Sequence, residues 1–238
     1  MQVFKINRND FEKVMENHQK WLSTSKKSGR KAELEGCDLS GWNLQNANLA
    51  GANLEGVKLD RANLRTTNFS GANFKGASFS EANLQWAIFQ GAKLQGACLK
   101  RANLHYATFC AADLRKALME GIFLHNAYFQ NAKLSMANLR EAKFRFTEMS
   151  FANLRNADLK GAVIATTKMD HADLSGSNLS NTQITMSNFD GAILRDVRLR
   201  LTHIIKSSFQ GADLRGADFI SIKVESVDFT DTEFASDN

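Results

Sequence analysis

Large apolar residues recur at every fifth position of this chain, from Leu34 to Phe234. The 41 positions of this series hold only Leu, Phe, Met, Ile or Val, and 25 of the 41 positions two residues before them hold Ala. A period of five matches neither an amphipathic helix nor a half-buried strand, which repeat every 3.6 and every two residues. It fits a chain that turns through a right angle after each five-residue segment and keeps the large and small residues inside. Four such segments close a square coil of twenty residues.

Glycine marks the predicted corners of this coil. Of the 15 glycines, 14 lie two residues after a large apolar position, between Gly36 and Gly216. Glycine is favoured where a turn requires a backbone conformation that a side chain opposes. We therefore expect the chain to turn at these positions.

The repeated segments include ANLAG (47–51), ANFKG (72–76) and ADLRG (212–216), and they continue in tandem over 32–234. This pattern resembles the pentapeptide repeat family, whose members form a right-handed quadrilateral β-helix. The resemblance implies an all-β solenoid of about ten coils, which at the ~4.8 Å spacing of strands would be roughly 50 Å long. It says less about function, because members of the family do different things.

The N-terminal residues follow a different pattern. Asn9 and Glu12 have the spacing of a capping box, and apolar residues at helical spacing then predict an amphipathic helix over about 10–22. Such a helix would cover the end of the first coil, which is otherwise exposed to water.

Residues 23–31 are polar and basic and contain Gly29, so we expect a flexible linker there. We accordingly divide the chain into a helical cap with its linker, residues 1–30, and a β-helix, residues 31–238.

Charge and cysteine content narrow the class of protein. The net charge of +5 comes mainly from residues 1–30, which hold seven basic and three acidic residues, so the repeats are almost neutral. The three cysteines, Cys37, Cys98 and Cys110, have no metal-type spacing and form no even-numbered framework. No apolar run is long enough for a membrane span, and we expect a cytoplasmic protein.

Positions twenty residues apart would stack on one side of the coil. We name the sides A, B, C and D after their first large apolar residues, Leu34, Leu39, Leu44 and Leu49. Just after the apolar position, sides A and B carry basic columns that predict a basic surface: Lys75, Arg115, Arg155, Arg195 and Arg215 on side A, and Lys100, Arg140, Lys160 and Arg200 on side B. Side D carries mainly acidic residues, so the rod is polarised.

The corner between sides C and D stands out because it holds large aromatic residues at outward positions. Trp86, Tyr106 and Phe146 belong to this corner column, and Ile88 and Tyr128 lie beside it on side D. An exposed aromatic cluster is typical of a protein-binding surface. The alternative is that the rings only stack on one another along the rod and stabilise it.

The sequence offers little evidence for a metal site or a catalytic site. His105 and His125 stack on side C, but no carboxylate or cysteine completes a metal site, and we expect neither metal nor cofactor. No nucleophile with its base, pair of carboxylates in a pocket or phosphate-binding loop is evident, and a filled square core leaves no cavity for a substrate. We therefore predict no catalytic residues and no enzymatic activity.

The C-terminal end of the rod has no second helix to cover it. We expect two rods to dimerise there through an apolar end that includes Leu201, Ile220, Phe229 and Phe234, with capping by Phe234 and the tail as the alternative.

These observations favour a scaffold that presents a rigid rod to an unidentified protein partner. The family resemblance implies one alternative, a DNA mimic that binds DNA gyrase or topoisomerase IV and protects it from quinolone-type poisons. The rod departs from that pattern because its repeats are not acidic overall. We do not expect nucleic acid binding, because acidic residues are interleaved with the basic columns.

Overall fold

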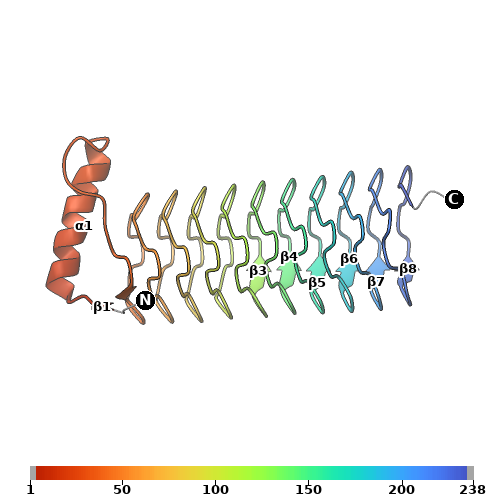
Figure 1. The fold of residues 1–238 in the computed structure, drawn as a ribbon, viewed down its shortest axis with the longest axis horizontal. Helices are drawn as coiled ribbons and strands as arrows, with labels where there is room; N and C mark the ends of the chain where they lie inside the picture. Colours follow the sequence, from red (N-terminus) through yellow and green to blue (C-terminus); the bar gives the residue numbers. More distant parts are fainter. Residues whose placement is uncertain (1–3, 235–238) are drawn as a thin grey trace.

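The computed structural model describes residues 4–234, and it shows a straight rod of square coils with one helix at its N-terminal end (Figure 1). Parallel bridges join positions twenty residues apart, from Glu33 and Asn53 at one end to Asp213 and Glu233 at the other. The predicted β-helix with an unbroken twenty-residue register is therefore confirmed.

On side C the bridges lengthen into strands, which stack as one parallel sheet in chain order. The strands are β3 (Phe123–His125), β4 (Lys143–Arg145), β5 (Val163–Ala165), β6 (Gln183–Thr185), β7 (His203–Ile205) and β8 (Lys223–Glu225). The middle residue of each strand from β3 to β7 is buried, and its two neighbours point outward. Side C thus presents a sheet surface with two outward columns of side chains.

The interior is filled as the five-residue pattern predicts. The large apolar residue and the alanine before it are both buried through most of the rod, for example Leu54 and Ala52. Phenylalanines stack between coils, with ring centroids 4.6 Å apart for Phe89 and Phe109 and 4.8 Å apart for Phe109 and Phe129. Where threonine replaces alanine, its hydroxyl donates to a backbone carbonyl, as Thr67 does to Leu44 at 2.8 Å. A buried hydroxyl is tolerated only with such a partner.

Every corner has the same backbone conformation. Each fifth residue from Gly36 to Asp231 has a positive φ, which makes 40 corners, 14 of them glycine and 26 of them other residues. At four corners a coil, these forty make the ten coils that were predicted. The left-handed conformation costs a residue with a side chain about 1–2 kcal/mol, so the ladder and the core must hold it in place.

Helix α1 (Arg8–Ser23) begins two residues earlier than the sequence suggests. Its N-cap is Asn7, whose side chain accepts a hydrogen bond from the Asp10 backbone N–H at 2.9 Å, so the predicted cap at Asn9 is wrong. Asn7 serves as the N-cap because its backbone is extended, as this position requires, whereas Asn9 already lies within the helix. In the described part of the chain, no helix has the length and apolarity needed to cross a bilayer.

Two sets of contacts fix α1 over the first coil. Strand β1 (Phe4–Lys5) pairs in parallel with β2 (Cys37–Asp38), and the buried Phe11 ring lies 5.1 Å from Trp42. Trp42 occupies a position that is compact elsewhere in the rod, and it fits because no coil precedes the first one. The covering role that was predicted for the helix is therefore seen in its packing.

The predicted flexible linker is instead folded against α1. The backbone N–H of Arg30 donates to the Asn17 carbonyl at 3.2 Å. Gly29 has a φ of +79°, and a Cβ at this position would lie 2.6 Å from the backbone nitrogen of Trp21. The chain can approach the helix this closely because Gly29 has no side chain.

Candidate protein-binding surface

The Trp86 and Tyr106 rings form a parallel stack at the corner between sides C and D. Their centroids are 4.0 Å apart, the angle between their planes is 2°, and the two residues remain 49% and 38% exposed. The rings therefore stabilise each other and face solvent at the same time. A rigid, exposed pair of this kind suits recognition of a protein.

The structure does not bring Phe146 into this stack, because Asn126 occupies the coil between Tyr106 and Phe146. The Phe146 ring packs instead against its neighbours on side C. It lies 5.9 Å from the His125 ring, and the Arg145 guanidinium lies 5.4 Å from its centroid. The predicted aromatic corner thus consists of two separate clusters.

Ile88 and Tyr128 lie next to the corner, on side D. Both are exposed, and Thr108 separates them, since it bridges to Ile88 on one side and to Tyr128 on the other. They widen the apolar area beside the Trp86–Tyr106 stack without contacting each other along the rod.

The predicted basic columns of sides A and B are held in ion pairs. Carboxylates pair with every member except Lys160 in the described part of the chain: Lys75 with Glu55, Lys100 with Glu120, Arg115 with Asp113, Arg140 with Asp158, Arg155 with Asp173, Arg195 and Arg215 with Asp213, and Arg200 with Asp218. Hydrogen bonding from Arg215 is the main reason why the pKa of Asp213 lies far below its ordinary value. Carboxylates thus compensate these columns except at Lys160, so the columns present no continuous positive surface.

Side C has a different charge pattern, which the sequence reasoning missed. Its outward positions are the residues before and after each large apolar residue and the corner residue that follows, and within residues 4–234 they hold one carboxylate, Glu225 on β8, which lies 3.4 Å from His203 Nε2. They include five cations, and none of these makes an ion pair within residues 4–234: Arg65, Lys143, Arg145, Lys206 and Lys223. We call these outward positions the side C strip. A comparison of the charges in each outward column of the sequence would have revealed the side C strip.

The centre of the side C strip lies on β3, β4 and β5. Lys143 is paired in register with Phe123 and Val163, and Arg145 with His125 and Ala165. The Lys143 Nζ lies 5.0 Å from the centroid of the Phe123 ring, which is 47% exposed. Both cations of β4 therefore lie over aromatic rings and have no carboxylate partner, which is an arrangement that stabilises a cation without neutralising it.

His105 and His125 adjoin this centre, with ring centroids 5.3 Å apart. Burial lowers the pKa of His125, and the nearby His105 and Arg145 lower it further. Within residues 4–234, no group of three His, Cys, Asp or Glu residues could hold a metal ion. The two imidazoles thus lie side by side on the strip without the further ligands that a metal site needs among the described residues.

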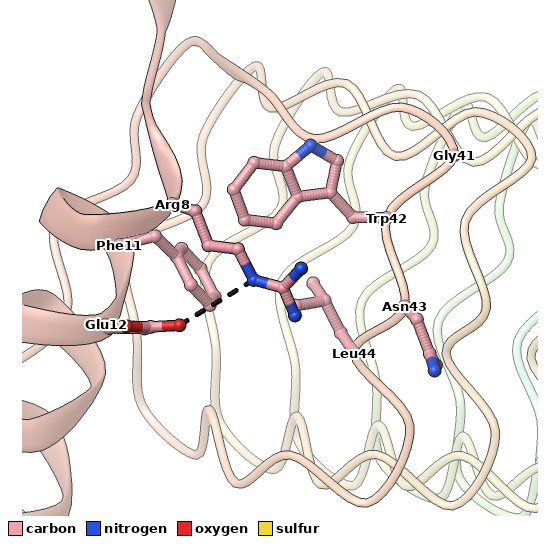
Figure 2. Close-up of a pocket in the computed structure, with 7 residues that line it drawn as sticks. All are labelled: Arg8, Phe11, Glu12, Gly41, Trp42, Asn43 and Leu44. Carbon is pink, nitrogen blue, oxygen red and sulfur yellow. Dashed lines mark ion pairs between the residues drawn. The ribbon is translucent and has the colours of Figure 1, made fainter.

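A pocket lies between α1 and the first coil (Figure 2). Phe11, Trp42 and Leu44 form its apolar walls, and Arg8 extends from the helix toward the coil, where its Nε lies 3.6 Å from Glu12 Oε1. The lining residues include no nucleophile. The pocket lies where the cap meets the first coil, and its charged lining residues, Arg8 and Glu12, pair with each other.

The C-terminal coil leaves apolar residues uncovered by any described residue. Val224 is 49% exposed and Phe234 is 47% exposed, although both occupy large apolar positions that are buried elsewhere. Phe229 contacts Phe209 and Phe234 and remains partly exposed. Leu201 and Ile220 do not belong to this end face: they point outward from side B, where the Leu201 N–H donates to the Ile220 carbonyl.

Comparisons with known proteins agree with this architecture. No curated protein matches the sequence. Among solved structures, HetL from the cyanobacterium Nostoc sp. strain PCC 7120, a pentapeptide repeat protein involved in heterocyst differentiation regulation, has a TM-score of 0.83 at 25% identity, over 90% of this chain and 94% of HetL. QnrB1, a plasmid-mediated fluoroquinolone resistance protein, has a TM-score of 0.42 at 18% identity, over 84% of this chain and 89% of its own.

A family model gives the clearest assignment. The model for pentapeptide repeats matches in eight copies, over residues 30–65, 67–105, 109–145, 124–161, 160–196 and 185–219. These segments cover most of the square coils described above. The chain therefore belongs to the pentapeptide repeat family.

Proposed function

We propose that this protein is a non-catalytic scaffold that binds a protein partner at the corner between sides C and D. The observation that carries this proposal is the exposed Trp86–Tyr106 stack. Tryptophan, tyrosine and arginine are enriched among the residues that dominate binding energy. Because the two rings already hold each other, they lose little conformational freedom when a partner covers them.

The interior of the rod supports a role without catalysis. Large apolar residues and alanines fill it and are fully buried through most of the rod. Binding sites for small molecules are usually concave and enclose most of their ligand. The likeness to HetL over nearly the full chain adds support, because HetL is involved in regulation.

DNA mimicry with binding to DNA gyrase is the second candidate, and the charge pattern weighs against it. A mimic of DNA needs a dense negative surface, whereas cations of sides A and B pair with carboxylates and side C carries five cations and one carboxylate, Glu225. A supercoiling assay tests this candidate, and we expect no inhibition of gyrase at micromolar protein.

The scaffold proposal is tested by affinity capture with matched variants. We expect Trp86→Ala combined with Tyr106→Ala to lose a partner that the wild-type rod retains. The control is Phe151→Ala, which removes another exposed ring stack, that of Phe151 on His171 with centroids 5.0 Å apart. The control should keep the partner, and circular dichroism should show that both variants are folded. Equal retention by the double variant and the wild type would refute the proposal.

A further inference from the structure

The side C strip holds five cations without ion pairs and one carboxylate, Glu225, which lies on β8, four coils beyond Lys143 and Arg145. Carboxylates that lie beside the strip belong to neighbouring columns, and one of them, Glu148 on side D, already pairs with Lys168 at 3.1 Å. No ion pair within residues 4–234 neutralises the five cations of the strip. A surface of this kind attracts an anionic partner and disfavours a cationic one.

Within the strip, Lys143 and Arg145 form the best organised pair of donors. They flank the buried Phe144 on β4, so both point outward, about 6.6 Å apart along the strand by ordinary strand geometry. An extended acidic segment places alternate carboxylates at the same spacing. The Phe123 and Phe146 rings restrain the two cations, and this reduces the entropy that binding would cost.

The aromatic rings of the strip distinguish between two classes of anionic polymer. Single-stranded nucleic acid binds through bases that stack on free aromatic faces. Here Trp86 and Tyr106 stack on each other, and cations lie over Phe123 and Phe146, so each of these rings has a face already in use. Carboxylates need no ring face, since they pair with the free donors of lysine and arginine. The geometry favours a protein segment.

We infer that the partner of the proposed scaffold presents an extended acidic segment, with carboxylates at alternate positions, which binds across the side C strip. Its carboxylates pair with Lys143 and Arg145. The Trp86–Tyr106 stack lies along the same rod face and bounds this site at the corner with side D. This inference rests on the proposed function, because it specifies the partner of that same surface.

Fluorescence anisotropy with a labelled peptide of alternating Glu and Tyr tests the inference directly. We expect Lys143→Gln combined with Arg145→Gln to weaken binding by about tenfold, because the peptide loses both cations. The matched control is Lys75→Gln with Arg115→Gln, which removes two cations that are already paired on side A. We expect the control to bind within about twofold of the wild type, since the charge change is equal but the site differs.

Three results would overturn the inference: no binding of the Glu/Tyr peptide, equal binding of the same peptide with Gln in place of Glu, or tighter binding of an oligothymidine of the same length. The two proposals also fail separately. If the captured partner is lost with the Trp86 and Tyr106 variant but retained with the Lys143 and Arg145 variant, the scaffold stands and the acidic segment does not. If the peptide binds side C while the Trp86 and Tyr106 variant keeps its captured partner, the scaffold corner fails.

Discussion

The Trp86 ring lies parallel to the Tyr106 ring at 4.0 Å although both residues have left-handed backbones, with φ of 61° and 60°. The stack stabilises the rod, while the backbone conformation opposes it. Substitution at one residue can separate these two effects, because alanine keeps the unfavourable backbone and glycine relieves it.

We expect Trp86→Ala to lower the free energy of unfolding by about 1 kcal/mol, the usual contribution of an aromatic pair. Trp86→Gly should be close to neutral, because relief of the backbone offsets the lost stack. Urea denaturation of the two variants measures the difference. If both variants lose the same stability, backbone strain at this corner is not significant.

A corner without an aromatic side chain tests the same strain alone. Ala111 has a φ of 56°, and we expect Ala111→Gly to raise the free energy of unfolding by about 0.5–1 kcal/mol. Gly91 occupies the same column one coil earlier, and a Cβ there would meet nothing within 4 Å. Gly91→Ala should therefore destabilise by a similar amount, through the backbone only. Opposite signs for the two variants in thermal unfolding support the argument, and equal signs refute it.

Asp213 accepts hydrogen bonds from both Arg195 and Arg215. Because its pKa is lowered in the folded protein, the stabilisation it supplies is present above the ordinary carboxyl pKa and is lost as the pH falls below about 4. We expect Asp213→Asn to destabilise the rod by about 1 kcal/mol at pH 7 and to reduce the loss of stability in acid. Urea midpoints from pH 2.5 to pH 7 check both effects, and unchanged acid sensitivity in the variant would contradict the assignment.

His18 is buried between α1 and the first coil, where its Nδ1 accepts a hydrogen bond from the Ala32 N–H at 3.1 Å. Burial lowers the pKa of His18, and the nearby Lys31 adds to this effect. The unfolded chain therefore binds the proton more readily, so stability should fall as the pH drops below about 6.5.

Hydrogen exchange of the α1 amides measures this effect, with His18→Gln as the comparison, since glutamine retains an acceptor without a titration in this range. We expect protection of α1 to fall between pH 7 and pH 5 in the wild type and to change less in the variant. His125 contributes pH dependence of the same sign, and the difference between the two proteins isolates His18. Identical pH profiles would assign the effect elsewhere.

The uncovered C-terminal coil predicts end-to-end dimerisation. We expect light scattering to show a dimer at about 10 μM protein, and Val224→Glu with Phe234→Glu to make it monomeric, because two charges would then be buried in the interface. Leu201→Glu with Ile220→Glu is the control, since these residues point outward from side B. A wild-type monomer would refute dimerisation, and loss of the dimer only in the control variant would place the contact on side B.

Much of this fold could be predicted from the sequence because one rule governs the interior. The apolar position, the alanine before it and the twenty-residue register are local and repeat without interruption, so residues such as Leu54 and Ala52 are placed by counting alone. The packing of Trp42 and Gly29 against α1 could not be predicted by counting. It depends on the contact between the helix and the first coil, which is not part of the repeat.

The candidate surface was harder to predict, because the role of an outward residue depends on which side chains contact it in the folded rod. The basic residues of sides A and B can be listed from the sequence, but their carboxylate partners could not be assigned, because many lie in another coil, as for Arg140 with Asp158 and Arg155 with Asp173, 18 residues further on. Lys143 and Arg145 belong to no long basic column. They matter because neither makes an ion pair within residues 4–234 and both lie over aromatic rings, and these contacts become clear only in the folded rod.

Because the register of twenty residues is constant, the length of the rod is proportional to the number of its coils. Each coil has the same corners and the same interior, so an added or removed coil would shift every later coil along the axis by ~4.8 Å without changing the side on which its residues lie. The distance between the N-terminal helix and the surface around Lys143 can therefore change in fixed steps while the surface itself stays intact. Evolution, or an engineer, can adjust the reach of this protein separately from what it binds.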